Sequence, residues 1–204
     1  MASGGGAGLA LRAAGLYFGA MDRVSMIKEA ALMKLRSRKP TAGKIFSFVV
    51  ATIDGAEKSL GAFKGHPLLI VNTASLCGYT PQYASLEKLH RNYQRRGLKI
   101  LAFPSDNFGH QEPGTDAEIK EFCRARYAVS FELFSKINVK GDRIHPLYVY
   151  LTKESEKAGA IAWNFTKFLV DAGGRVVERF GPAEDPLSPS VTGRIEELLS
   201  SSKG

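Results

Sequence analysis

Hydrophobic positions from residue 45 onward follow a regular order of strand-like and helix-like spacing. Residues 45–50 alternate between the two faces of a strand, and Asp54-Gly55 after them is a turn signal. This pattern predicts an N-terminal β-hairpin. Two continuous apolar runs, at residues 67–71 and 98–103, then predict buried strands.

Three segments carry apolar positions at helical spacing. The first begins at the Thr-Pro pair of residues 80–81 and runs to about residue 96. The second begins after Thr115, where Glu118 stands three residues on and completes a capping box. The third covers residues 189–200. These spacings predict helices that bury one face each.

The order of these elements predicts the fold class. A strand, a helix and a second strand between residues 67 and 103 form a β-α-β unit, which requires a parallel pair. Residues 165–170 and 175–180 flank a Gly-Gly turn and predict an antiparallel hairpin. We therefore expect an α/β protein with a thioredoxin-like fold, in which a central mixed β-sheet is flanked by helices and preceded by the N-terminal β-hairpin.

Charge divides the chain of 204 residues into two parts. Residues 1–42 hold seven basic and two acidic residues, so they carry +5 of the formal net charge of +8. The domain that we expect at residues 43–204 is therefore only weakly basic. It has no interleaved aromatic and basic motif, and we expect no nucleic-acid partner.

The extension at residues 1–42 has two interpretations. Its first 20 residues are rich in Gly and Ala and contain Arg but no acid, as in organelle transit peptides. The alternative is a disordered tail. We accordingly expect a cytoplasmic protein if the extension is a tail, and a mitochondrial or other organellar one if it is a transit peptide.

One of the two cysteines occupies a position suited to chemistry. Cys77 directly follows a predicted strand and directly precedes a predicted helix. The N-terminus of a helix stabilises negative charge, so a thiol there forms the nucleophilic thiolate more readily. The alternative is a buried core cysteine without reactivity.

Four long segments resemble the glutathione peroxidase family, in the order in which that family carries them. They are NTASLCGYTPQY (72–83), LAFPSDNFGHQEPG (101–114), FSKINVKGDRIHPLY (134–148) and AWNFTKFLVDAGG (162–174). The resemblance covers nearly the whole domain. It implies an enzyme that reduces hydrogen peroxide and organic or lipid hydroperoxides to water and alcohols, in defence against oxidative stress.

The resemblance also assigns catalytic roles. Cys77 corresponds to the peroxidatic residue, and Trp163 and Asn164 correspond to the family's Trp and Asn. We place the family's Gln at Asn107, whose amide is the same group on a shorter side chain. Gln111 lies nearby and receives no role here.

These residues fit the chemistry of a thiol peroxidase. A Cys77 thiolate would attack a peroxide oxygen and become a sulfenic acid, while the indole and amide N–H groups polarise the peroxide. No cofactor is needed beyond a thiol co-substrate, either glutathione or thioredoxin. The scattered histidines show no metal-ligand spacing. The alternative function is a peroxide sensor that relays oxidation to a partner protein through a disulfide.

The role of the second cysteine distinguishes glutathione from thioredoxin as the reductant. The resemblance implies that Cys123, in the predicted second helix, is a possible resolving residue that forms a disulfide with Cys77 for thioredoxin to reduce. Its position is one residue earlier than the usual spacing, and the helix would have to unwind. Cys123 as a packing residue remains the alternative.

A short connection between Tyr150 and Trp163 resembles the monomeric members of the family that act on phospholipid hydroperoxides. An uncovered site would admit bulky lipid peroxides. Lys153, Lys157 and Lys167 would then face anionic headgroups in a transient contact with a membrane surface.

Overall fold

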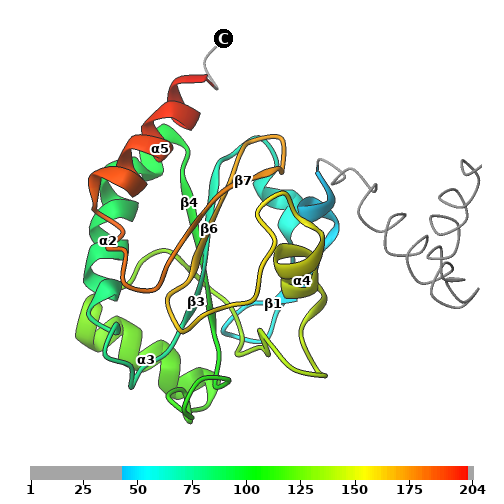
Figure 1. The fold of residues 1–204 in the computed structure, drawn as a ribbon. Coiled ribbons are helices and arrows are strands. Elements are labelled where there is room, and N and C mark those ends of the chain that lie inside the picture. The colour runs from blue at the N-terminus through cyan, green and yellow to red at the C-terminus, as the bar shows by residue number, and fades with distance from the viewer. Residues whose placement is uncertain (1–42, 202–204) are drawn as a thin grey trace, which may run out of the picture. The chain divides into compact units, whose positions relative to one another are not determined.

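A mixed five-stranded sheet forms the centre of the computed structural model, which describes residues 43–201 (Figure 1). The strand order is β5-β4-β3-β6-β7. The strands β3, β4 and β5 are parallel, whereas β6 is antiparallel to β3 and to β7. Their bounds are Leu68–Thr73 (β3), Lys99–Pro104 (β4), Glu132–Leu133 (β5), Lys167–Val170 (β6) and Val176–Phe180 (β7). The predicted mixed sheet is confirmed, and the predicted extension at residues 1–42 lies outside the described residues.

Helices cover both faces of this sheet, and every residue of β3 is therefore buried. Leu69 and Val71 pack on the face covered by α2 (Gln82–Tyr93), α3 (Asp116–Tyr127) and α5 (Pro189–Ser201). Leu68 and Ile70 point to the opposite face, which α4 (Pro146–Val149) covers. Figure 1 shows these two helical layers on either side of the strands. The alternation of side chains along a strand thus produces two separate cores.

The predicted helices form with small differences at their ends. The α2 helix begins at Gln82 with Pro81 as its N-cap, and residues Gln94–Arg96 continue it as a 3-10 turn. Gly97 then stops the chain in the left-handed region, with φ of 109°. The predicted capping box at the start of α3 is present in both directions between Thr115 and Glu118.

The N-terminal hairpin forms, but its first strand is shorter than predicted. Residues Lys44–Ser47 are a 3-10 helix, and β1 (Val49–Ala51) pairs antiparallel with β2 (Glu57–Ser59). The Phe46 N–H closes a turn onto the Gly43 carbonyl, which buries Ile45 in the core on the α4 side. Burial of this single side chain therefore overrides the two-residue alternation of the sequence.

Two further elements were not predicted because they are too short to show a period. The strand β5 has two residues, and α4 has four, beginning with Pro146 after His145 as N-cap. A π-helical turn at Tyr150–Glu154 continues α4. Within residues 43–201, none of the helices combines the length and the apolar character that a membrane span requires.

Candidate active site

Cys77 lies in a tight loop beyond the carboxyl end of β3. The Thr80 hydroxyl accepts a hydrogen bond from the Cys77 N–H at 2.9 Å and donates one to the Ala74 carbonyl at 2.8 Å. Both bonds fold the loop back before α2 begins. The Tyr79 N–H points at the Cys77 sulfur, with 3.4 Å between nitrogen and sulfur. A donor in that position stabilises a thiolate, and the side chain remains 7% exposed.

Gln111 joins the cysteine loop to the segment that contains Asn164. Its backbone carbonyl accepts a hydrogen bond from the Leu76 N–H at 3.0 Å, next to Cys77. Its side-chain oxygen accepts a second one from the Asn164 amide, also at 3.0 Å. Asn164 itself is completely buried. The structure therefore places the Gln111 side chain in the candidate site beside one of the predicted catalytic residues.

Trp163 lies at the rim of this site and is 37% exposed. Its ring packs against Phe108 with 5.3 Å between the centroids. Its carbonyl accepts a hydrogen bond from the Asn72 side chain at 3.2 Å, which fixes the Trp-Asn segment to the end of β3. The next residue but one, Phe165, has a φ of 65°, a strained value for a side chain of this size. Such strain is typical of segments held in place for function.

Among the described residues no hydrogen bond joins Asn107 to Asn164, and the Asn107 amide has other partners. Its side-chain oxygen accepts hydrogen bonds from the Ser105 hydroxyl at 3.0 Å and from the Val139 N–H at 2.6 Å. Its side-chain nitrogen donates to Asn138 at 2.9 Å. These contacts leave the Asn107 amide holding the loop at residues 138–139, so the role of the family's Gln at Asn107 stays a prediction and Gln111 is an alternative to it. Gln111, to which the prediction gave no role, presents a second amide beside Asn164.

A signal for Gln111 was present in the sequence. It lies four residues after Asn107 in the same matched segment, and Gly109 and His110 precede it. Both of these residues adopt positive φ, of 62° and 50°. This pair reverses the chain and brings Gln111 back against the cysteine loop, where its carbonyl accepts the Leu76 N–H.

Cys123 is fully buried on the inner face of α3 and belongs to the same core cluster as Cys77. Burial raises the pKa of its thiol to about 11, and the charge of Glu112 adds to this effect. Both cysteines are free. In this conformation Cys123 is therefore an inert thiol, as expected of a packing residue or of a resolving residue before α3 opens.

The position of Lys167 contradicts the prediction that this side chain faces a membrane surface. Its side chain is completely buried on β6 and donates hydrogen bonds to the Gln82 side chain at 2.8 Å and the Glu184 carbonyl at 2.6 Å. Burial lowers the pKa of this amine to about 8. Lys167 thus connects β6 to the start of α2 and cannot face headgroups. Lys157 forms an ion pair with Glu178, whereas Lys153 is exposed as predicted.

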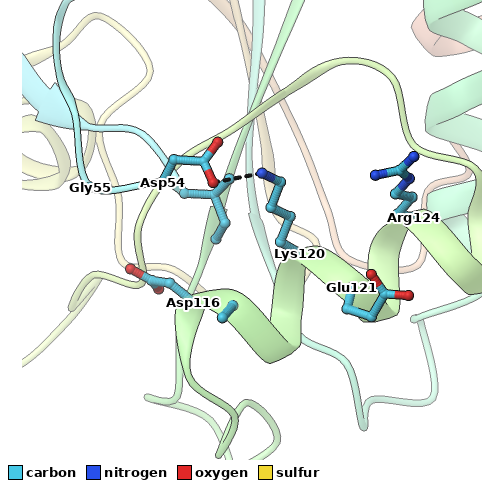
Figure 2. A pocket seen from close by; sticks show the side chains of 8 residues that line it. Asp54, Gly55, Asp116, Lys120, Glu121 and Arg124 are labelled. Atoms are coloured by element: carbon cyan, nitrogen blue, oxygen red, sulfur yellow. Dashed lines mark hydrogen bonds and ion pairs between the residues drawn. The ribbon is translucent and has the colours of Figure 1, made fainter.

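A hollow on the outer side of α3 lies away from the candidate site (Figure 2). It has a volume of about 640 Å³, and Asp54, Lys120 and Arg124 line it. The Lys120 ammonium and the Asp54 carboxylate form an ion pair across it at 2.6 Å. None of the predicted catalytic residues borders this hollow. Among the described residues there is also no group of metal-ligating side chains.

Comparisons with known proteins point to one family. The glutathione peroxidase family model matches residues 45–152. A glutathione peroxidase of Lactococcus lactis subsp. cremoris is 47% identical over 156 residues, covering 76% of this chain and 98% of the relative. A hydroperoxy fatty acid reductase of Synechocystis is 46% identical over 163 residues, covering 76% and 95%.

Solved structures show the same likeness. The crystal structure of Trgpx in its apo form has a TM-score of 0.64 and 32% identity, covering 79% of this chain and 97% of that one. The structure of T. cruzi GPX1 has a TM-score of 0.60 and 36% identity, covering 78% and 97%. A thioredoxin family protein from Chlorobium tepidum, at 15% identity and a TM-score of 0.55, shares the fold alone.

The fold and the matches define a thioredoxin-like enzyme with thiol chemistry. The chain belongs to the glutathione peroxidase family. It is a peroxidase that acts on hydroperoxides with a thiol reductant, and the predicted fold, family and enzyme class are confirmed. The comparisons favour this activity over the alternative of a peroxide sensor.

Proposed function

We propose that the enzyme oxidises Cys77 with a hydroperoxide and regenerates it through a disulfide with Cys123, which a thioredoxin-like protein reduces. One observation carries the proposal: the chain has only two cysteines, and both lie in the same core cluster. A relative of Schizosaccharomyces pombe, 47% identical over 135 residues, is named a glutathione peroxidase-like peroxiredoxin, in line with this route.

The first step uses the groups around Cys77. The thiolate attacks one peroxide oxygen, the O–O bond breaks, and the sulfur becomes a sulfenic acid while hydroxide or an alkoxide leaves. The leaving group takes a proton from solvent and departs as water or an alcohol. The Tyr79 N–H stabilises the thiolate at 3.4 Å. The Trp163 indole and the amides of Gln111 and Asn164 would donate to the leaving oxygen, which lowers the barrier to its departure.

The second step requires α3 to open. Cys123 is buried on this helix, so its sulfur reaches Cys77 only when the helix gives up part of its packing. Its thiolate then attacks the sulfenic sulfur and expels water. A dithiol reductant completes the cycle by thiol–disulfide exchange, which begins at one sulfur of the new bond.

Mass spectrometry of the intact protein after one equivalent of hydrogen peroxide tests this route. We expect a loss of two hydrogens and a disulfide peptide that joins Cys77 to Cys123. The Cys123→Ser variant should stop at the sulfenate and lose thioredoxin-dependent turnover. Equal turnover of this variant with glutathione and with thioredoxin would overturn the proposed route and favour direct reduction by glutathione.

For the substrate, we propose lipid hydroperoxides in addition to hydrogen peroxide. Leu76 is 64% exposed beside Cys77, and Trp163 is exposed at the rim, so an apolar edge borders the reactive sulfur. This edge, rather than the lysines, would make the transient contact with a membrane surface. Comparison of the rates with phosphatidylcholine hydroperoxide and with hydrogen peroxide tests the proposal, and no activity on the lipid would overturn it.

We further propose that the enzyme works as a monomer without a bound cofactor, in the cytoplasm or, if residues 1–42 are a transit peptide, in a mitochondrion or another organelle. The short connection at residues 151–162 supports the monomeric state. Size-exclusion chromatography with light scattering measures the mass directly. Fluorescent fusions with and without residues 1–42 decide the compartment.

A further inference from the structure

Asn72, near the carboxyl end of β3, is hydrogen-bonded to residues 163–166 through its side chain and through its backbone. The side-chain amide donates to the Trp163 carbonyl at 3.2 Å. The backbone carbonyl accepts from the Phe165 N–H at 2.6 Å, and the backbone N–H donates to the Thr166 carbonyl at 3.4 Å. The strand that leads into the cysteine loop therefore also holds the segment that carries two of the predicted catalytic side chains.

Thr166 holds the same carbonyl from within the segment. Its hydroxyl donates to the Trp163 carbonyl at 2.9 Å, and the residue is 1% exposed. This carbonyl therefore accepts two side-chain hydrogen bonds, one from Asn72 and one from Thr166. Because a peptide unit is planar, fixing the direction of the carbonyl also fixes the N–H of the next residue, Asn164.

The backbone conformation that these bonds hold is unfavourable for the residue that adopts it. Phe165 has a φ of 65°, in the left-handed region that a side chain with a Cβ rarely enters. Its ring is completely buried and meets the ring of Tyr83 edge-on, with 5.5 Å between the centroids. Such a conformation persists only where the surrounding contacts determine it, and the bonds from Asn72 and Thr166 are among these contacts.

Asn72 is a polar residue in an otherwise apolar environment. The residues before it on β3, at 68–71, are all apolar and buried. The Asn72 side-chain oxygen is itself buried without a hydrogen-bond partner among the described residues, which is unfavourable. An apolar side chain would avoid this cost if packing were the only requirement. The feature that an apolar side chain lacks is the N–H donor to the Trp163 carbonyl.

We propose that Asn72 and Thr166 are positioning residues, which hold the Trp163 indole and the Asn164 amide in place for the oxidation of Cys77. This role rests on the proposed donation of hydrogen bonds by these two side chains. Neither positioning residue has to touch the peroxide, because both act through the Trp163 carbonyl. A donor displaced by about 1 Å can cost about a hundredfold in rate, so the backbone that carries the donors has to be fixed.

Two variants of the full chain remove one donor each. Thr166→Val removes the hydroxyl and keeps the branched shape, and Asn72→Leu removes the amide and keeps about the same size. Stopped-flow with hydrogen peroxide measures the oxidation of Cys77 in a single turnover. We expect each variant to be slower by about tenfold or more, because the Trp163 carbonyl loses one of its two side-chain partners.

Fluorescence gives a second measurement, which reports on the segment itself. Trp163 is the one tryptophan of the chain, so light absorbed by tryptophan alone excites this side chain and no other. In the wild type its ring lies against Phe108 and is 37% exposed. Acrylamide quenches an indole that it can reach. We expect stronger quenching in Thr166→Val and in Asn72→Leu than in the wild type, because the ring is held less firmly.

Two further variants separate positioning from general damage to the fold. Thr166→Ser keeps the hydroxyl and should restore both the oxidation rate and the quenching of the wild type. Thr192→Val is the matched control, because the Thr192 hydroxyl also donates to a backbone carbonyl, that of Ser188, at 3.0 Å on α5. It should leave both measurements unchanged. Thermal unfolding verifies that each variant is folded at the temperature of the assay.

The results that would overturn the inference are distinct. Unchanged quenching in Thr166→Val and Asn72→Leu would overturn the positioning role and leave the proposed donors standing. Stronger quenching at an unchanged oxidation rate would overturn the proposed donation by Trp163 and Asn164 and, with it, the positioning role. Equal losses in Thr166→Ser and Thr166→Val would show that the hydroxyl is not the group that matters.

Discussion

The side-chain amide of Asn164 donates a hydrogen bond to the side-chain oxygen of Gln111 at 3.0 Å, although 53 residues separate them in the chain. This bond fixes the orientation of the Gln111 amide, because its oxygen is occupied and its nitrogen remains the donor. Since the Gln111 backbone also holds Leu76, the same residue positions the cysteine loop and supplies a donor beside it.

Replacement of Gln111 by Leu should slow the oxidation of Cys77 by about tenfold to a thousandfold, because one donor to the developing oxyanion is lost. Stopped-flow measurement of peroxide consumption under single-turnover conditions gives this rate. Asn107→Ala is the comparison. It should leave the rate nearly intact and lower the free energy of unfolding, because Asn107 binds Asn138 and Val139. The reverse result would restore Asn107 as the catalytic amide.

Cys77→Ser should abolish peroxide reduction, because a serine hydroxyl is not ionised at neutral pH and has no sulfur to oxidise. Trp163→Phe should retain the ring contact with Phe108 but remove the indole N–H, so we expect a partial loss of rate. Stopped-flow with hydrogen peroxide measures both. A Ser variant as fast as the wild type would eliminate Cys77 as the peroxidatic residue.

Lys167 should make the stability of the fold depend on pH. Its pKa falls from 10.5 to about 8 on folding because of burial. Between these values the unfolded chain keeps a proton that the folded chain has released, so stability rises with pH in this window. Relative to Lys167→Met, the wild type should gain about 2 kcal/mol between pH 7.5 and 9.5.

Urea denaturation of both proteins at the two pH values measures this gain. Other groups titrate in the same window, but they are common to the two proteins and cancel in the difference. The lost hydrogen bonds to Gln82 and Glu184 lower the stability of the variant by an amount that does not change with pH. A constant difference would show that Lys167 keeps its proton in the folded protein.

The two ends of α3 should respond in opposite directions to substitution. Thr115→Ala removes the capping box and should cost about 1 kcal/mol of unfolding free energy. Ala128→Gly should gain up to about 1 kcal/mol, because Ala128 ends the helix in the left-handed region with φ of 49°, where glycine is not strained. Hydrogen exchange of the α3 amides checks both variants locally, and the same sign of change in both would contradict the assignment.

The elements that the sequence predicted well are those with a repeated pattern. The β3 and β4 strands contain the apolar runs 68–71 and 100–103 because both of their faces are buried. The capping box at Thr115 is a local arrangement that needs only a few residues. The parallel pairing of these two strands followed from the helix between them. The strand β5 and the helix α4 were not predicted because two and four residues are too few to show a repeated hydrophobic pattern.

The prediction that failed, that Lys167 faces a membrane surface, concerns side-chain direction. Whether Lys167 points outward or inward depends on the antiparallel register of β6 with β3, which places it opposite Val71, and on the Gln82 partner that α2 provides. The approach of Gln111 to the cysteine loop depends on a chain reversal at Gly109 and His110, which both adopt positive φ. Composition and spacing do not contain this tertiary information.

The burial of Cys123 on α3 has a consequence for thermal adaptation. On the proposed route, each turnover requires α3 to leave its packing for a moment. Each kcal/mol that strengthens this packing without strengthening the open state slows the opening by about fivefold. Resistance to heat and speed of turnover therefore compete at one helix, and relatives from hot and cold habitats should differ first in the residues that pack and cap α3.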